Sequence, residues 1–257
     1  MNLHHDKELP FYFGKDGELF GMFHATLAPA RKAVLLCPPL GQDQIRCHRL
    51  YRQLAHALVA EGIAVLRFDY YGTGDSAGDS VEVDWDRCVA DTLVAAAELR
   101  ARSGATEITA FGARLGGSIA LCAARAGSLA GLVAWDPVLD GSAYAARLDR
   151  MQRALAVDAQ RFTKPRLASD AADQWLGFAT SDRLRQQLIE LQLEPTRVPT
   201  LILDSLSASP VGEWQSLQAD VLALQPPTPW EDLQRLELAI LSHPVVRAIT
   251  GHLREAA

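Results

Sequence analysis

The sequence predicts an α/β fold in which helices flank a mostly parallel sheet and a helical cap is inserted before the last strands. Short apolar runs alternate with longer stretches of helical periodicity along most of the 257 residues, an order typical of strands linked by helical crossovers. Runs such as AVLLC at 33–37 are apolar throughout, which indicates strands buried on both faces. The sequence has no internal repeats, so we expect one domain with an insertion.

The first two strands are expected to form a hairpin, at 9–13 and 18–25 around a turn at 14–17. Buried strands are expected at 33–37 and 63–68, and further strands are expected at 107–111, 132–135, 198–204 and 219–225. Helices alternate with them and are expected at 50–61, 84–102, 115–126 and 244–253. In the first of these helices Leu54 and Leu58 share one face, and Gly62 ends the helix.

The cap is predicted from a change in the pattern between Val138 and Pro195, where strand signals disappear and the sequence becomes helical, polar and rich in arginine. We therefore expect residues 138–195 to form the cap and residues 1–137 and 196–257 to form the core. Arginines recur every three residues in this segment, at Arg147, Arg150 and Arg153. This spacing places them along one helix face, which is more often a solvated face than a gate for anions.

The composition is that of a mildly acidic globular protein. Hydrophobic residues make up 49%, charged residues 22%, and the net charge is -6, so electrostatics gives no reason to expect nucleic acid or an anionic membrane as partner. The N-terminal MNLHHDKELPF has no apolar targeting segment, and we expect a cytoplasmic protein without membrane insertion. Four cysteines (Cys37, Cys47, Cys88 and Cys122) show no C-x-x-C or zinc spacing, so we expect reduced thiols, no metal and no cofactor.

Three loop motifs and the opening of the cap resemble those of one enzyme superfamily. They are CPPLG at 37–41, FDYYGTGDSAG at 68–78, FGARLGG at 111–117 and AWDPVLDG at 134–141. Together they resemble the α/β-hydrolases, in particular the serine-aminopeptidase-like and exosortase-associated hydrolases, over nearly the whole chain. The resemblance implies the α/β-hydrolase sheet with a cap. It specifies the chemistry much less, because one fold hosts many activities.

The FGARLGG motif has the spacing of the superfamily's nucleophile elbow, a strained turn from strand to helix flanked by small residues. Gly112 and Gly116 supply the small flanks, but the central position holds Arg114. Arginine has no hydroxyl, thiol or carboxylate to attack a substrate, so an acyl-enzyme at this position is excluded. The resemblance places the two oxyanion donors in the backbone N–H groups of Leu40 and Leu115, which survive any change of side chain.

The acid and the base of the superfamily have no clear counterparts. The acid is implied a few residues beyond the strand at 198–204, where Asp204 comes too early. The histidine is implied in the loop after the last strand, yet QPPTPW at 225–230 contains none. His243 follows later, as a catalytic candidate or as an exposed or helix-capping residue. Asp136 and Asp204 follow strands at the edge where ligands bind, and each is equally a turn former or the partner of an arginine.

Two further residues are candidates for the substrate pocket. Cys37 ends a strand beside the oxyanion loop and is the one thiol that could replace the serine, although a small core residue is the commoner role. Tyr70 either lines the pocket or packs beneath the cap. With Leu40, Leu115 and Asp136, these residues form the predicted substrate-binding set, and Arg114, His243 and Asp204 form the predicted catalytic set.

Arg114 is expected to have an anionic partner, because a cation is disfavoured at a helix N-terminus. The partner is either an internal carboxylate, Asp136 or Asp204, or the carboxylate or phosphate of a ligand. Two functions remain open. In one, the protein acts on a small acyl, ester or thioester substrate without a serine nucleophile. In the other, it is an inactive pseudohydrolase that binds a ligand or a protein. A homodimer is left open.

Overall fold

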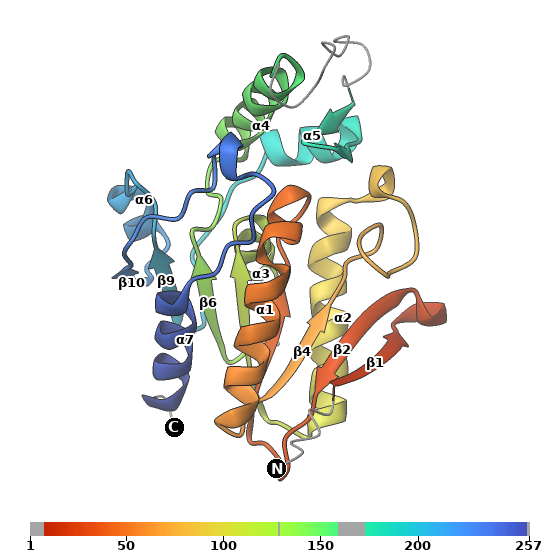
Figure 1. Ribbon diagram of the computed structural model, residues 1–257. Helices are drawn as coiled ribbons and strands as arrows, with labels where there is room; N and C mark the ends of the chain where they lie inside the picture. The colour runs from red at the N-terminus through yellow and green to blue at the C-terminus, as the bar shows by residue number, and fades with distance from the viewer. Residues whose placement is uncertain (1–7, 128, 159–172, 256–257) are drawn as a thin grey trace, which may run out of the picture.

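An eight-stranded sheet forms the centre of the computed structural model, which describes residues 8–127, 129–158 and 173–255 (Figure 1). The strands lie in the order β1-β2-β4-β3-β5-β6-β9-β10. Their bounds are β1 Glu8–Phe13, β2 Leu19–His24, β3 Lys32–Cys37, β4 Ala64–Phe68, β5 Glu107–Ala113, β6 Gly131–Trp135, β9 Thr200–Asp204 and β10 Asp220–Ala223. β2 pairs antiparallel with β1 and β4, whereas all the other pairs are parallel. The predicted α/β fold with a mostly parallel sheet is confirmed.

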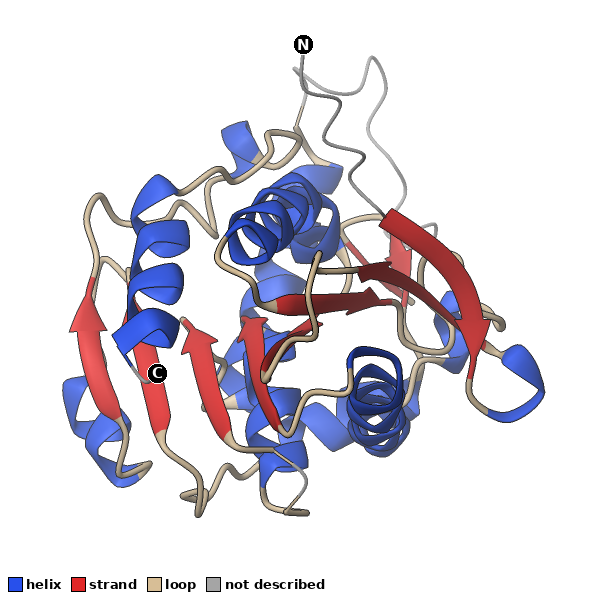
Figure 2. Cartoon of the chain, turned by 90° about the horizontal axis from the view of Figure 1, so that it is seen from below, coloured by secondary structure: helices blue, strands red, loops and turns tan. Residues whose placement is uncertain are grey.

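Helices cover both faces of the sheet (Figure 2), and side chains alternate along each strand between two cores. On one face, α1 (Gln42–Ala60) and α7 (His243–Glu255) pack against residues such as Val34 and Leu36 of β3. On the other face, α2 (Trp85–Ser103), α3 (Leu115–Ala124) and α6 (Val211–Ser216) pack against residues such as Leu35 of β3. Burial on both faces explains why these strands are apolar throughout.

α1 begins at Gln42, eight residues before the predicted start at 50, so that prediction was wrong. Residues 42–49 read QDQIRCHR, a polar stretch without an apolar stripe. The helix nevertheless buries Arg46 and Cys47 on its inner face, and a buried arginine does not register in a hydrophobic pattern. The correction matters because it brings the first turn of α1 to the edge of the sheet where the motif loops lie.

The segment after β6 contains α4 (Gly141–Ala156), the short antiparallel strands β7 (Gln174–Trp175) and β8 (Phe178–Ala179), and α5 (Asp182–Ile189). The expectation that this segment has no strands was therefore wrong, because a turn with Leu176 and Gly177 at positive φ closes a small hairpin. Residues 159–172 of the predicted cap lie outside the described residues. In Figure 1, α4 and α5 lie beyond the carboxyl ends of the central strands.

The parallel strands bring five chain segments to one edge. β3, β4, β5, β6 and β9 end there, so that CPPLG, FDYYGTGDSAG, FGARLGG and AWDPVLDG all begin at the edge that α4 and α5 face. Ligands bind at this edge in open α/β sheets. Within the described part of the chain, none of the helices combines the length and apolar composition that crossing a membrane requires.

Candidate active-site cavity

The turn between β5 and α3 has the strained geometry that the glycine spacing predicts. Arg114 stands alone between the two elements with φ 51° and ψ -128°, a conformation that L-residues rarely adopt. A Cβ on Gly112 would lie 2.4 Å from the backbone of Gly116, and one on Gly116 would lie 2.4 Å from the carbonyl oxygen of Pro38. Both flanks must therefore be glycine, because strand, helix and the CPPLG loop touch through their backbones.

The Arg114 side chain is buried, with 4% of its surface exposed. Its Nη1 donates a hydrogen bond to the backbone carbonyl of Asp136 at 3.0 Å. The guanidinium carbon lies 5.4 Å from the ring of Tyr144 and 5.2 Å from that of Trp230, both within cation–π range. Nε has no hydrogen-bond partner among the described residues. The guanidinium thus keeps N–H groups to offer to another molecule.

The carboxylate that faces Arg114 is Asp43, at the start of α1. Its Oδ2 lies 3.7 Å from Nε of Arg114 and accepts a hydrogen bond of 3.3 Å from the hydroxyl of Tyr144. Nη1 of Arg46, in the next turn of α1, lies 4.0 Å from Oδ1 of Asp43. Burial raises the pKa of the Asp43 carboxyl, although Arg114 and Arg46 oppose the rise. Asp136 and Asp204 are the predicted internal partners of Arg114, and the prediction misses Asp43 because it places the start of α1 at residue 50 instead of Gln42.

The carboxylate of Asp136 is committed to other donors. It accepts hydrogen bonds from the backbone N–H of Ser205 at 2.7 Å, the Ser205 hydroxyl at 2.5 Å and Nε1 of Trp230 at 2.7 Å. Burial raises the pKa of Asp136, and these hydrogen bonds oppose the rise. Only the backbone oxygen of Asp136 contacts Arg114 directly. Asp136, Trp230 and Arg114 therefore lie in series, with the edge of the indole on the carboxylate and its face toward the guanidinium.

Trp230 belongs to the loop after β10, where the family resemblance implies a histidine. Arg46 fixes this loop, since its Nη1 and Nη2 donate to the backbone carbonyls of Trp230 and Pro229, each at 2.7 Å. Arg46 is only 2% exposed. The signal that could have revealed Trp230 is its place in QPPTPW, but an indole carries no basic nitrogen and was not a candidate.

A cavity of about 200 Å³ opens in front of Arg114. The core contributes Leu40, Asp43, Leu115 and Trp230 to its wall, and the segment after β6 contributes chiefly apolar side chains, among them Tyr144, Leu148, Met151, Trp175, Phe178 and Leu188. The backbone N–H groups of Leu40 and Leu115 donate no hydrogen bond within the described chain. The cavity therefore joins a buried cation and free backbone donors to an aromatic and aliphatic lining.

A comparison with known protein families assigns the chain to one of them. The family model described as serine aminopeptidase S33 matches residues 28–202. The chain belongs to this family. The comparison with curated protein sequences found no match for this family member.

Solved esterase structures share its fold. Est1E from Butyrivibrio proteoclasticus, bound to ferulic acid, has a TM-score of 0.67 at 17% identity over 95% of this chain and 98% of that chain. A thermostable carboxyl esterase from Bacillus coagulans has a TM-score of 0.64 at 14% identity, over 97% and 98%. An esterase from Pyrococcus furiosus has a TM-score of 0.65 at 15% identity, over 97% and 90%. The fold of this S33 family member is the α/β-hydrolase fold.

Three residues of the predicted substrate-binding set, namely Asp136, Cys37 and Tyr70, are absent from the wall of the cavity in this family member. Cys37 is fully buried at the end of β3, where burial raises the pKa of its thiol to about 12. A thiol in that state is not a nucleophile. Tyr70 is also fully buried, with its ring packed 5.0 Å from that of Phe68. Both pack into the core below the loops.

Two residues of the predicted catalytic set also lie away from Arg114. Asp204 binds its own loop, through Oδ1 to the backbone N–H of Leu206 at 3.0 Å and through Oδ2 to Nε1 of Trp214 at 3.0 Å. His243 is exposed at the first residue of α7 and does not line the cavity. The structure brings together Arg114, Leu40 and Leu115, and it adds Asp43 and Trp230 to them.

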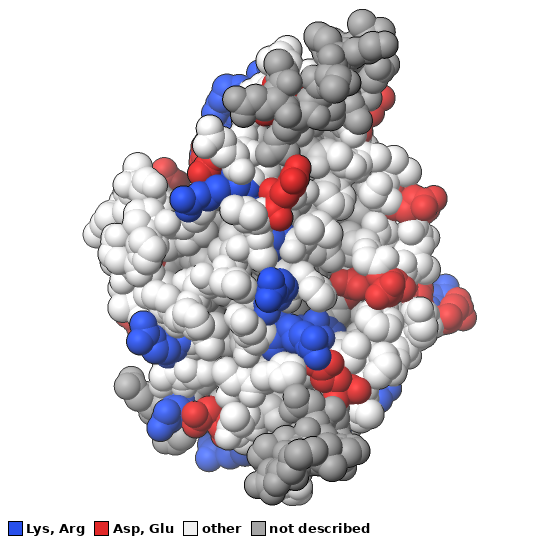
Figure 3. Space-filling view, in the orientation of Figure 1, with Lys and Arg blue, Asp and Glu red and all other residues white. Residues whose placement is uncertain are grey.

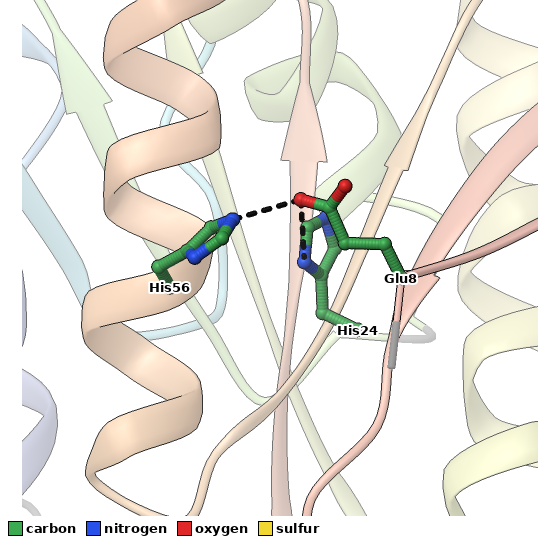
Figure 4. Close-up of side chains that lie close together, drawn as sticks. All are labelled: Glu8, His24 and His56. Carbon is green, nitrogen blue, oxygen red and sulfur yellow. Dashed lines mark hydrogen bonds and ion pairs between the residues drawn. The ribbon is translucent and has the colours of Figure 1, made fainter. Parts of the chain in front are cut away.

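A second cluster, formed by Glu8, His24 and His56, has the residue types of a metal site, with ligand atoms within 4.8 Å of one another (Figure 4). Its polarity does not suit a metal. Nε of Arg67 donates to Nε2 of His24 at 3.0 Å, so the neutral ring carries its proton on Nδ1, toward Glu8. Arg52 adds a second cation, 3.0 Å from Glu8. The cluster is better explained as an ion-pair network that joins the N-terminal hairpin to α1.

Proposed function

We propose that this S33 family member binds a small molecule with a carboxylate or acyl group and an aromatic or aliphatic body, and that it does not cleave esters through a covalent intermediate. The observation that carries the proposal is Arg114, a buried cation at the elbow whose Nε has no hydrogen-bond partner among the described residues. The protein is in this sense a pseudohydrolase. Its closer resemblance to exosortase-associated hydrolases stays a prediction.

The absence of covalent turnover is supported by what surrounds the elbow. Neither histidine nor cysteine occurs among the described residues of the cavity wall. Trp230 occupies the loop of the expected base, and its indole N–H donates to Asp136 but cannot accept a proton. The hydroxyls of Ser76 and Ser118 instead donate to backbone carbonyls, at 2.6 Å and 2.7 Å. A serine without an adjacent base stays protonated and weakly nucleophilic.

The preference for an acid group is supported by the donors at the cavity. A charge-assisted hydrogen bond from a guanidinium contributes about 1.5–3 kcal/mol, and the N–H groups of Leu40 and Leu115 add neutral donors beside it. The aromatic wall, with Tyr144 and Trp175, suits a flat apolar body. Ferulic acid, which Est1E binds, combines an aromatic ring with a carboxylic acid and is the probe we choose.

The test is a titration of the protein with ferulate in which binding is measured by calorimetry. We expect the protein to bind ferulate and the Arg114→Gln variant to bind it at least about tenfold more weakly, since one charge-assisted hydrogen bond is lost. Arg125→Gln is the matched control, because Arg125 pairs with Glu194 at the surface, outside the cavity wall. Equal affinity in Arg114→Gln, or no binding of ferulate and its cinnamate and benzoate analogues to any variant, contradicts the proposal.

A second candidate function is hydrolysis of an activated ester or thioester by water, without a covalent intermediate. The free N–H groups of Leu40 and Leu115 favour it, because they could stabilise an oxyanion. Steady-state turnover of p-nitrophenyl esters and acyl thioesters, lost in Arg114→Gln but kept in Arg125→Gln, would support this function. Hydrolysis that is no faster than in buffer without protein rejects this second function.

We also propose that residues 138–195 act as a cap that completes the cavity. In support, α4, the β7–β8 hairpin and α5 each supply wall residues, namely Tyr144, Trp175, Phe178 and Leu184. Arg147 of α4 forms an ion pair of 2.8 Å with Glu231 beside Trp230, which joins this segment to the loop after β10.

A further inference from the structure

The buried ionisable groups around Arg114 are balanced in charge. Two cations, Arg46 and Arg114, face two carboxyl groups, Asp43 and Asp136, and all four side chains are buried or nearly so. An uncompensated charge in such surroundings is costly. An anionic ligand that pairs with Arg114 would add a negative charge to this set, so the charge must be compensated when the ligand enters.

Proceeding from the proposed function, we infer that a carboxylate ligand enters this cavity together with a proton, and that Asp43 is the residue that takes up the proton. Asp43 lies on the cavity wall, with Oδ2 directed at Nε of Arg114 at 3.7 Å. A ligand carboxylate that binds this face of the guanidinium meets Asp43 as a like charge. Protonation of Asp43 removes the repulsion and supplies an O–H that can donate to the ligand.

Asp136 is the weaker candidate for the proton because of its hydrogen bonds. Two of its three donors are N–H groups, those of Ser205 and Trp230, which cannot reverse to accept a proton. Among the described residues, the Asp43 carboxylate accepts one longer hydrogen bond of 3.3 Å, from the hydroxyl of Tyr144, and a hydroxyl can donate or accept. A proton on Asp43 can be accommodated by turning the Tyr144 hydroxyl, whereas a proton on Asp136 weakens the acceptor of two N–H groups that cannot turn.

The charged and polar groups that face Asp43 determine the direction in which the pKa of its carboxyl shifts. On its own helix the charged neighbour is Arg46, from the elbow it is Arg114, and from α4 it is Arg147, while the neutral hydroxyl of Tyr144 donates a hydrogen bond. Arg147 is itself neutralised by Glu231. Burial raises the pKa of Asp43 against these cations. A ligand carboxylate that occupies Arg114 removes part of the stabilisation of the Asp43 anion, which moves the pKa further in the same direction.

The experiment measures proton uptake when ferulate binds, by calorimetry in buffers of different ionisation enthalpy between about pH 5.5 and about pH 8.5. For the unmodified protein we expect net uptake of up to about one proton, and the dissociation constant should rise with pH wherever uptake occurs. Asp43→Asn should take up none and should bind ferulate with little dependence on pH. Glu213→Gln is the control, because Glu213 is an exposed carboxyl of α6 outside the cavity wall, and this variant should keep the uptake.

The possible results separate the two proposals. Ferulate binding without proton uptake, or uptake that persists in Asp43→Asn, overturns the role of Asp43 and leaves the proposed function standing. Binding to neither protein overturns both. If Asp43→Asn does not fold, the ¹³C shift of the Asp43 carboxyl in the unmodified protein at fixed pH gives the same answer. A shift toward the protonated value on adding ferulate supports the inference, and an unchanged shift rejects it.

Discussion

Arg114 combines two unfavourable features with three favourable contacts. Its positive φ costs about 1–2 kcal/mol, and a cation at the N-terminus of α3 costs about 0.3–1 kcal/mol when exposed. The hydrogen bond to the carbonyl of Asp136, the nearby Asp43 carboxylate and the aromatic faces offset these costs. These contacts stabilise Arg114 in its unfavourable position. The guanidinium still has N–H groups that can bind a ligand.

At the same scale, the series Asp136, Trp230, Arg114 predicts what would restore serine chemistry. In Arg114→Ser combined with Trp230→His, the imidazole Nδ1–H can replace the indole N–H on Asp136 and leave Nε2 toward position 114. We expect the double variant to react with a fluorophosphonate probe at least about tenfold faster than Arg114→Ser alone. The unmodified protein should not be labelled.

The matched control for this prediction is Arg114→Ser combined with Trp230→Phe, which keeps a ring but supplies no base. Mass spectrometry of the labelled peptide locates the modified residue. Equal labelling of the two double variants at position 114, or labelling of Ser76 or Ser118 in the unmodified protein, would show that a base outside this series exists.

At the scale of elements, the contact between β5, α3 and the CPPLG loop predicts intolerance at Gly116. Its added Cβ would meet the carbonyl oxygens of Cys37 and Pro38 at 2.5 Å and 2.4 Å, and backbone cannot move aside as a side chain can. We expect Gly116→Ala to lower the free energy of unfolding by about 2 kcal/mol or more, measured by urea denaturation.

Gly251→Ala provides the comparison for Gly116→Ala. Gly251 lies inside α7 with nothing within 4 Å of an added Cβ, so alanine there should stabilise the helix by about 0.5–1 kcal/mol. If the two variants unfold at the same urea concentration, the close packing at the elbow does not limit stability.

The network between the hairpin and α1 predicts a loss of stability in acid. Burial and Arg67 lower the pKa of His24 from 6.5 to about 4. Burial raises the pKa of Glu8, but hydrogen bonds from His56 and Arg52 outweigh it and bring it from 4.5 to about 2. In both cases the unfolded chain binds more protons than the folded one, so stability falls as pH drops from 6.5 to about 4 and again toward about 2.

Urea denaturation across this pH range tests the prediction. His24→Gln removes the upper titration, so its stability should change less than that of the unmodified protein between pH 6.5 and about 4. His48→Gln is the control, because His48 is an exposed residue of α1. The prediction is wrong if the His24 and His48 variants follow the same pH dependence.

Element positions were predicted well where apolar pattern determines them and poorly where polar residues are buried. The central strands β3, β4, β5, β6 and β9 were found because both faces are covered, which makes them largely apolar runs, whereas the edge strand β10 is exposed along its length. The first two turns of α1 were missed because Arg46 is buried through hydrogen bonds to the Trp230 loop, a role that hydrophobic periodicity does not record. Asp43 lies in those turns and was missed with them. Trp230 was missed because its indole has no basic nitrogen, whereas a histidine was expected in its loop.

At the scale of the whole molecule, the sheet divides the protein into two cores, and the cavity lies at the edge where both end. α1 and its core supply Asp43, α3 and the opposite core supply Leu115, and the segment after β6 closes over them. On the face shown in Figure 3, basic and acidic side chains lie scattered among uncharged ones. The sequence predicted this architecture but not which carboxylate would face Arg114, because that depends on where distant loops meet.

The glycine contacts at the elbow have a consequence for how chemistry changes within such proteins. The turn is shaped by Gly112 and Gly116 against the backbone of the CPPLG loop, and the side chain at position 114 takes no part in that contact. A substitution at position 114 can therefore change the chemistry of the site while the backbone of the turn keeps its conformation. A shared fold therefore specifies the backbone of this turn, whereas the residue at position 114 specifies which chemistry is possible there.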